Sequence, residues 1–302
     1  MSSITTDQQK ETASQQAPGM TMAQRRAIGR TWRIVVIVIA IVYALFPVIY
    51  IISASFNPAN SLSTSAIIPR NPSLEHYRTL FERDFWLWIR NSFVVATLAA
   101  ALSVFVGSVS AYAFSRFRFV GRRSLLLAVF LVQVFPNTLS IVATFLLINI
   151  IGEYIPFLGL NTLGGLILVY LGGAMGINTW LMKGYFDTVP RDLDESAKID
   201  GATDWQIFWL IIVPLVRPIL AVVAILTFVS TYSDYLLALV LVQREEAYTL
   251  AVGLSRFLGD NYGQRWGPFA AGALIGAIPI IVIYLLLQDY IVGGLTAGSV
   301  KG

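Results

Sequence analysis

The sequence predicts an all-α polytopic membrane protein that crosses a bilayer about six times, and two observations lead to this fold class. The 302-residue chain is 56% hydrophobic and only 13% charged, with a mean hydropathy of +0.71, whereas an average soluble domain carries about a quarter charged residues. Its apolar residues also form runs of the ~20 residues that a helix needs to cross ~30 Å of hydrocarbon. Each run must be helical, because a segment in lipid has to satisfy its own backbone hydrogen bonds.

The N-terminal end is predicted to lie outside the membrane. Residues 1–24 are rich in Ser, Thr and Gln, and four arginines follow before residue 34. Such a segment buries too little apolar surface to offset its ordering entropy, so residues 1–33 are expected to form a disordered, basic cytoplasmic tail. The first apolar run is about twice as long as a signal-peptide core, which favours an uncleaved anchor.

The apolar runs place the transmembrane domain at residues 34–292, followed by a cytoplasmic tail at 293–302. We expect spans near residues 34–55, 91–114, 124–148, 162–182, 207–232 and 269–290. Trp86, Trp88, Tyr232 and Tyr235 fall where aromatic anchors of the outer interface are expected.

Lysine and arginine gather on one side of these spans. They occur before residue 34, in the short turn FSRFRFVGRR (114–123) and in the loop after residue 182, whereas the other side carries fewer, in longer loops. Because cytoplasmic loops are enriched in Lys and Arg, we expect the basic side, with both chain ends, to be cytoplasmic.

Several kinds of chemistry are disfavoured. The chain has no cysteine, and its single histidine, His76, is expected to be a solvated loop residue. Nucleotide-binding loops, nucleophile elbows and paired intramembrane carboxylates do not occur in the sequence. Arg217 can snorkel to the inner interface, and Asp234 is expected to be solvated at the outer end of its span. The scarcity of intramembrane charge disfavours a self-powered ion-coupled carrier.

The loop at 183–218 predicts a rigid helical elbow. Asp192 or Asp194 is expected to cap a short helix, and Gly201 to take the left-handed conformation at its end. Thr203 and Gln206 have the spacing of a capping box for the next helix. Pro214 and Pro218 are expected to bend the chain as it enters the fifth span.

Two weaker signals lie within the spans. Gln133, Asn137, Thr138 and Asn178 either line a pathway or hydrogen-bond between helices, and the second reading is favoured. Glycine pairs at positions 172/176 and 272/276 have the spacing that allows close helix packing.

The elbow resembles the EAA loop of ABC-importer permeases, a binding-protein-dependent family with type I architecture. The similarity rests on Glu195-Ser196-Ala197, Gly201 and Pro214, with Ser196 where the family usually has alanine. In that family the loop is a coupling helix that docks into the ATP-hydrolysing subunit. The coupling residues that the resemblance implies are Asp194, Glu195, Ser196, Ala197, Asp200, Gly201, Ala202 and Pro214.

The resemblance extends over nearly the whole chain after residue 34. AYAFSRFRFVG, GEYIPFLGLNTLGG and YTLAVG look very like segments of the smaller membrane subunits of maltose/maltodextrin permeases. The family also implies a scoop loop that enters the binding protein and a tail that contacts the ATPase. Carried over by position, the scoop is Gly253, Leu254, Asp260, Asn261, Tyr262 and Gly263, and the tail is Gly298, Lys301 and Gly302.

The resemblance implies a non-catalytic permease subunit of an ATP-driven importer for maltose, maltodextrin or a related oligosaccharide. Its partners would be a larger sister permease, an ATPase dimer that binds ATP and Mg²⁺, and an extracytoplasmic sugar-binding protein in a bacterial inner membrane. The chain itself would carry no cofactor, metal or catalytic residue, and most sugar contacts would come from the larger subunit. A trehalose or other sugar permease, an ion-coupled carrier and a non-transporting scaffold are the alternatives.

Overall fold

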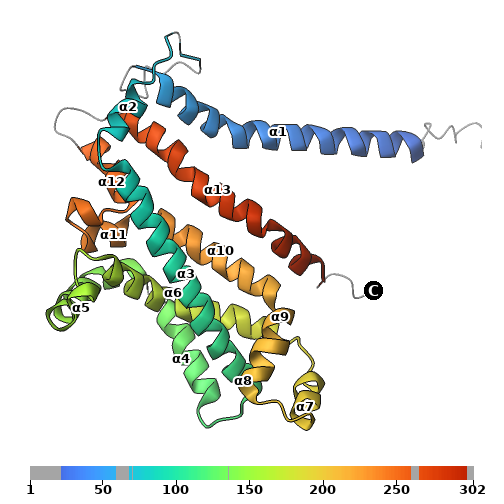
Figure 1. Cartoon of the computed structure of the whole chain (residues 1–302). Coiled ribbons are helices and arrows are strands. Elements are labelled where there is room, and N and C mark those ends of the chain that lie inside the picture. Colours follow the sequence, from blue (N-terminus) through green and yellow to red (C-terminus); the bar gives the residue numbers. More distant parts are fainter. Residues whose placement is uncertain (1–21, 59–67, 70, 135, 260–264, 298–302) are drawn as a thin grey trace, which may run out of the picture. The chain divides into compact units, whose positions relative to one another are not determined.

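The computed structural model describes residues 22–58, 68–69, 71–134, 136–259 and 265–297, and these contain helices and no strands. The all-α prediction is therefore confirmed (Figure 1). The α-helices are α1 (Met22–Phe56), α2 (Glu75–Phe81), α3 (Phe85–Arg116), α4 (Arg122–Val134), α5 (Ile141–Tyr154), α6 (Leu163–Phe186), α7 (Asp192–Ile199), α8 (Asp204–Ile207), α9 (Val213–Leu215), α10 (Arg217–Ser233), α11 (Leu236–Leu241), α12 (Leu250–Gly259) and α13 (Trp266–Ala297). Short 3-10 helices η1 (Asn137–Ser140), η2 (Pro156–Leu158) and η4 (Glu245–Ala247) and a π-helical turn η3 (Phe208–Ile212) complete the set.

The chain divides into two compact units, Met1–Ile51 and Ile52–Gly302. The first unit contains most of α1, whose membrane-length segment Arg30–Phe56 has none of its most apolar window buried. A helix that is apolar on all sides and uncovered suits contact with lipid. Helix α1 begins at Met22, so the arginines before residue 34 belong to a helix and not to the expected disordered tail.

The second unit contains the remaining membrane-length helices. Three of them are continuous: α3, α6 and the Trp266–Tyr290 part of α13. Two further spans are bent pairs: Arg122–Gln133 with Thr138–Tyr154 at 82°, and Asp204–Leu215 with Arg217–Ser233 at 79°. Counting each bent pair as one span and adding α1 gives six spans by length and composition.

Proline accounts for the position of both bends. Pro136 lies in the break before η1, and Pro218 occupies the first turn of α10 directly after the break at Val216. A proline removes a backbone donor and disfavours helical geometry in the residue before it. The bend predicted at the entry to the fifth span is confirmed, whereas the third predicted span is broken and not continuous.

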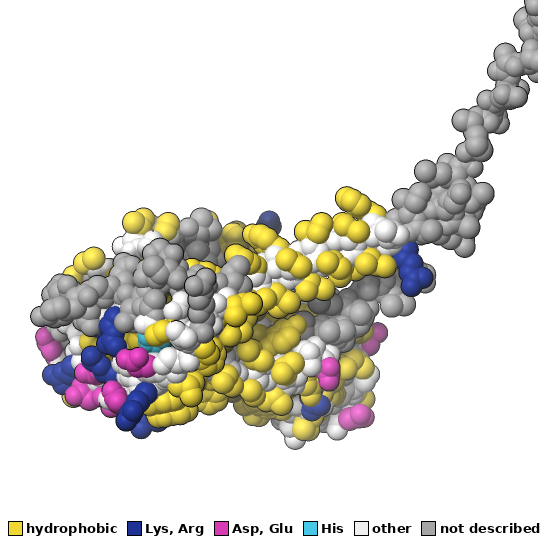
Figure 2. Space-filling view, turned by 90° about the horizontal axis from the view of Figure 1, so that it is seen from above, with side chains coloured by type: hydrophobic (Ala, Val, Ile, Leu, Met, Phe, Trp, Pro, Cys, Tyr) yellow, Lys and Arg dark blue, Asp and Glu magenta, His cyan; other side chains and the backbone are white. Residues whose placement is uncertain are grey.

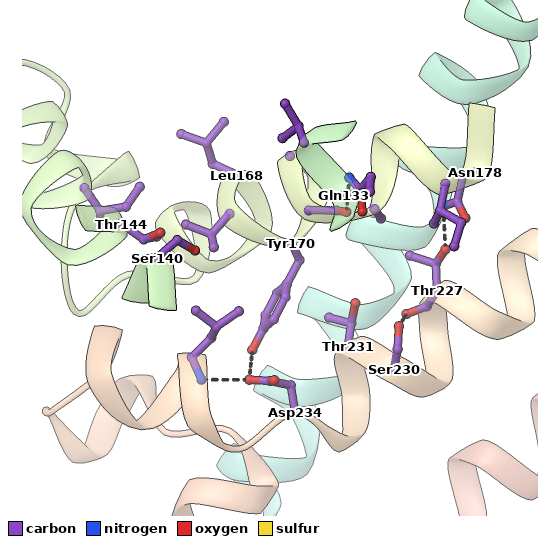
Figure 3. Close-up of a pocket in the computed structure, with 18 of the residues that line it drawn as sticks. Gln133, Ser140, Thr144, Leu168, Tyr170, Asn178, Thr227, Ser230, Thr231 and Asp234 are labelled. Atoms are coloured by element: carbon purple, nitrogen blue, oxygen red, sulfur yellow. Dashed lines mark hydrogen bonds between the residues drawn. The ribbon is translucent and has the colours of Figure 1, made fainter. Parts of the chain in front are cut away.

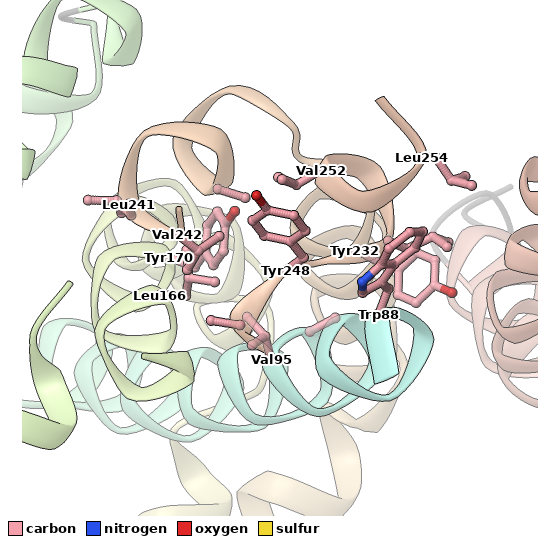
Figure 4. Packing of buried hydrophobic residues seen from close by; sticks show 14 of the residues in the cluster. Trp88, Val95, Leu166, Tyr170, Tyr232, Leu241, Val242, Tyr248, Val252 and Leu254 are labelled. Carbon is pink, nitrogen blue, oxygen red and sulfur yellow. The ribbon is translucent and has the colours of Figure 1, made fainter. Parts of the chain in front are cut away.

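Buried side chains form two hydrophobic clusters. The larger one joins α3, α6, α10 and α12 through residues such as Trp88, Leu166 and Tyr248 (Figure 4). Trp88 and Tyr232 are only 2% and 3% exposed, so both are core residues and the prediction that they are interface anchors is wrong. The smaller cluster lies beneath the elbow and contains Tyr112 and Phe208.

Hydrophobic side chains cover much of the surface. Figure 2 shows one group of charged side chains at the left of the view, with the histidine beside it, and further charged side chains elsewhere among the hydrophobic ones. His76 is only 3% exposed and its Nε2 lies 2.6 Å from the carbonyl oxygen of Asn57. The expectation of a solvated His76 is therefore wrong, because the ring packs against Gly267 at the start of α13.

Candidate functional site

The elbow consists of α7, a tight turn and α8, and its turn chemistry follows the sequence. Gly201 has φ +84°, and Thr203 and Gln206 form the reciprocal capping box, so both predictions are confirmed. The predicted cap of α7 is wrong, because the N-cap residue is Arg191 and no side chain caps the helix. Asp194 points instead toward α3, where it has a charged partner.

Packing fixes the elbow to the ends of α3 and α6. Ala197 and Ala202 pack against the smaller hydrophobic cluster, and the Ala202 N–H donates to the Ala197 carbonyl at 2.9 Å. The Tyr112 hydroxyl on α3 donates to the Asp204 carbonyl at 3.4 Å. These contacts attach α7 and α8 to α3 and to the start of the fifth span.

A buried ion pair reinforces this attachment. Arg116 Nε, at the end of α3, lies 2.5 Å from Asp194 Oδ2, and the two side chains are 6% and 11% exposed. Burial raises the pKa of the Asp194 carboxyl, and the nearby Arg116 guanidinium offsets this only in part. The second oxygen, Oδ1, is buried with no hydrogen-bond partner in the described part of the chain.

Further polar contacts tie the same helix ends together. Arg116 donates to the Val189 carbonyl at 3.1 Å, and Arg191 donates to the Ser115 carbonyl at 2.8 Å. Asp187 accepts hydrogen bonds from Ser115 at 2.7 Å and from Lys183 at 2.5 Å. Burial alone would raise the pKa of Asp187, but these hydrogen bonds outweigh it and hold the pKa below its usual value.

The outer face of the elbow is open. The EAA-loop side chains Glu195, Ser196, Asp200 and Gly201 are exposed, and Ala197, Ala202 and Pro214 are partly buried. Two large hydrophobic side chains accompany them, with Ile199 87% exposed and Leu193 41% exposed. The exposed face of α7 therefore presents both acidic and apolar side chains.

A separate cavity of about 920 Å³ lies between α5, α6 and α10 (Figure 3). Its wall combines aliphatic side chains with hydroxyl and amide groups, among them Thr144, Ser230 and Thr231. Gln133 and Asn178 also line it, although Gln133 donates to the Gly173 carbonyl, and Asn178 donates to Ser103 and Thr227. The favoured prediction of interhelical hydrogen bonds is thus confirmed for these two residues.

Asp234 is the single charged residue among the described residues that line this cavity, and it is partly exposed there. Its Oδ1 accepts hydrogen bonds from the Tyr170 hydroxyl at 2.9 Å and from the backbone N–H of Leu237 (Figure 3). It also accepts one from the backbone N–H of Ala238. These bonds hold the carboxylate at the start of α11. Sequence reasoning missed the pairing because Tyr170 lies on another helix, although an aspartate at the end of a span is itself a functional signal.

The other predicted site residues are placed as follows. Gly253 and Leu254 lie on α12 and are buried, so they offer no loop side chains to a partner protein. The remaining scoop positions Asp260, Asn261, Tyr262 and Gly263, and the tail positions Gly298, Lys301 and Gly302, lie outside the described residues. Thr138 is exposed beside the first bend, and the side chain of Asn137 lies outside the described residues.

Comparison with known proteins gives consistent matches. Residues 83–296 match the family model of the binding-protein-dependent transport system inner membrane component. The chain is 44% identical over 275 residues to the maltose/maltodextrin transport system permease protein MalG of Vibrio vulnificus strain YJ016, covering 85% of this chain and 91% of that protein. It is 41% identical over 285 residues to the galactooligosaccharides transport system permease protein GanQ of Bacillus subtilis strain 168, covering 93% and 99%.

The fold is also found in a solved importer. A chain of a bacterial ABC transporter that imports the acidic polysaccharide alginate matches with a TM-score of 0.75 and 25% identity, over 91% of this chain and 99% of that chain. A second alginate transporter structure, in complex with a pentasaccharide-bound periplasmic protein, matches with a TM-score of 0.63 and 19% identity.

Proposed function

Because the chain belongs to the family of binding-protein-dependent transport system inner membrane components, we propose that it forms half of the translocation pathway of an ATP-driven oligosaccharide importer. It is a membrane permease of the ABC importer type. The observation that carries the proposal is the elbow, which presents an exposed EAA-type helix while packing on the smaller hydrophobic cluster and pairing with Arg116 of α3.

The proposed substrate is maltose, maltodextrin or a related oligosaccharide. Support comes from the similarity to permeases named for maltodextrin and for galactooligosaccharides. Both classes are neutral sugars, and the relatives cover most of the length of this chain. Trehalose is a further candidate within the same importer class.

The proposed mechanism is alternating access driven from outside the chain. Closure of an ATPase dimer displaces α7, and the Arg116–Asp194 ion pair and the smaller hydrophobic cluster carry that displacement to α3 and the fifth span. The cavity between α5, α6 and α10 then changes the side on which it opens. The free energy comes from the hydrolysis of ATP, bound with Mg²⁺ on the partner, so the chain acts without a catalytic residue of its own.

The proposal requires three kinds of partner: a larger sister permease, an ATPase dimer and an extracytoplasmic sugar-binding protein. It also places both chain ends in the cytoplasm of a bacterial cell, with α7 and the basic turn after α3 on that side. The coupling role is assigned to the exposed α7 residues around Glu195. The partner-contacting roles are assigned to the scoop positions Asp260, Asn261, Tyr262 and Gly263 and to the predicted tail.

Co-purification tests this assembly. The tagged chain is isolated from its native membrane in a gentle detergent, and proteins that accompany it are identified by mass spectrometry. We expect a second permease, an ATPase and a sugar-binding protein. Recovery of the chain alone, in detergents that preserve other importers, would contradict the proposal and favour a self-contained carrier.

A further inference from the structure

We infer that this subunit itself contributes a sugar-binding subsite, in which the free oxygen of Asp234 accepts hydroxyl groups of a neutral oligosaccharide within the cavity between α5, α6 and α10. The inference deepens the proposed function, since it names the ligand class and its acceptor on this chain. It departs from the expectation that the larger subunit supplies most of the sugar contacts.

The carboxylate of Asp234 is held in one orientation. Its Oδ1 accepts three hydrogen bonds, from the Tyr170 hydroxyl at 2.9 Å and from the N–H groups of Leu237 and Ala238 at 3.1 and 3.3 Å. Oδ2 accepts no hydrogen bond within the part of the chain that the structure describes, and the residue lines the cavity (Figure 3). An immobilised carboxylate with one oxygen free is a preorganised acceptor.

The rest of the wall suits a sugar. Aliphatic side chains such as Leu168 and Ile177 line the cavity and suit the C–H faces of a pyranose ring. The hydroxyl groups of Thr144 and Ser230 add hydrogen-bond donors and acceptors. The volume of about 920 Å³ lies near the upper end of the ~300–1,000 Å³ that is usual for small-molecule sites. Few polar groups placed in an otherwise apolar wall are what fixes the orientation of a bound ligand.

The charge of the cavity wall distinguishes neutral from acidic sugars. Asp234 is the sole charged residue of the lining, so the cavity wall on this chain is negative. Hydrogen bonds from neutral hydroxyls to a carboxylate are stronger than those to a neutral acceptor. An acidic sugar, such as the alginate carried by the structurally similar importer, would meet like-charge repulsion here. The subsite therefore favours neutral sugars.

An experiment can distinguish a purely structural role of Asp234 from the proposed sugar-binding role. Capping α11 and binding Tyr170 use Oδ1 alone. In Asp234→Asn the amide oxygen replaces Oδ1 in all three hydrogen bonds, while the amide nitrogen replaces the charged acceptor. If the role were structural, the asparagine variant would behave as the wild type.

The test uses the whole importer, purified with its co-purifying subunits and reconstituted into proteoliposomes. Uptake of radiolabelled maltotriose and galactotriose and hydrolysis of ATP are measured together, with the binding protein supplied. Asp234→Asn is compared with two other variants. Tyr170→Phe keeps the charge of Asp234 but removes one of the hydrogen bonds that hold its carboxylate, and Asp289→Asn is the control. Asp289 is exposed on α13 and does not line the cavity.

For Asp234→Asn we expect the number of sugars transported per ATP to fall by about tenfold, since a hydrogen bond to a charged acceptor is lost. Tyr170→Phe should lower it by about threefold, and Asp289→Asn should leave it unchanged. Wild-type ratios in Asp234→Asn would overturn the inference. Should that variant fail to assemble, an unchanged ratio in Tyr170→Phe would do so. Wild-type importer that takes up neither of these sugars, nor maltose or trehalose, would instead contradict the proposed function.

Discussion

At the scale of single residues, Gly201 is the position where backbone geometry alone sets the requirement. Its φ is +84°, and a Cβ added there would have no atom within 4 Å. A β-branched residue in this conformation costs about 1–2 kcal/mol from backbone strain, whereas asparagine tolerates it. We predict that Gly201→Val loses most of the substrate-stimulated ATP hydrolysis of the reconstituted importer and that Gly201→Asn retains it. Equal stimulation in both variants would refute this role.

The Arg116–Asp194 pair gives a second prediction at this scale. Both side chains are almost fully buried, so Arg116→Met leaves an uncompensated carboxylate. Removing one partner of such a pair costs about 3–5 kcal/mol. We predict a marked drop in the thermal unfolding temperature of the detergent-solubilised protein. The double variant Arg116→Met with Asp194→Leu should recover much of the loss, and a double variant as unstable as the single one would argue against the pair.

The pH dependence of this carboxyl follows from its raised pKa. The folded state holds the Asp194 proton more tightly than the unfolded chain, because burial raises the pKa. The contribution to stability is therefore greatest at low pH and falls as the pH rises from the usual carboxyl range through the raised pKa. We predict that Arg116→Met extends the fall in stability to higher pH and that Asp194→Asn removes it. The measurement is the free energy of unfolding of each variant between about pH 4 and pH 8.

The sequence predicted those residue-level features that depend on near neighbours in the chain. The Thr203–Gln206 capping box and the left-handed Gly201 depend on neighbours within four positions, and both are present. Asp194 has a partner on α3, so its helix-capping role was mispredicted. The hydrogen bond between Tyr170 and Asp234 was not predicted, since Tyr170 lies on a different helix.

At the scale of elements, glycine determines how closely α12 approaches α3. A Cβ on Gly253 would lie 2.2 Å from Trp88 Cδ2, which is buried on α3, whereas a Cβ on Gly184 of α6 would meet no atom within 4 Å. Overpacking of this kind costs about 1–3 kcal/mol. We predict that Gly253→Ala lowers the unfolding temperature of the solubilised protein.

The matched control for that prediction is Gly184→Ala, which replaces a helical glycine without a clash. Alanine is the better helix former by about 0.5–1 kcal/mol, so this variant should be at least as stable as the wild type. Destabilisation of equal size in both variants would mean that close packing at Trp88 is not the cause.

The extent of the helices was easier to predict than their bends. Long apolar runs mark the membrane-length helices because a helix must satisfy its own hydrogen bonds in lipid. The 82° bend between α4 and the segment Thr138–Tyr154 was missed, since Pro136 lies inside an otherwise continuous apolar run. Whether a proline kinks a helix or breaks it depends on tertiary packing, which a single sequence does not contain.

At the scale of the whole molecule, the two sites lie on different parts of one connected bundle. The elbow is an exposed, acidic and apolar surface fixed to α3. The cavity lies between α5, α6 and α10, and α3 packs against α6 and α10. This arrangement lets a push on α7 reach the cavity through packed helices. We propose that α7 couples a partner ATPase to transport in this way.

The most direct test of that claim is substrate-stimulated ATP hydrolysis by the reconstituted importer carrying Glu195→Lys. The matched control is Asp192→Lys, which reverses an exposed charge on the same helix outside the predicted EAA motif. We predict that Glu195→Lys abolishes stimulation while the chain stays inserted in the membrane, and that Asp192→Lys keeps most of it. Full stimulation in Glu195→Lys would contradict the coupling role of α7.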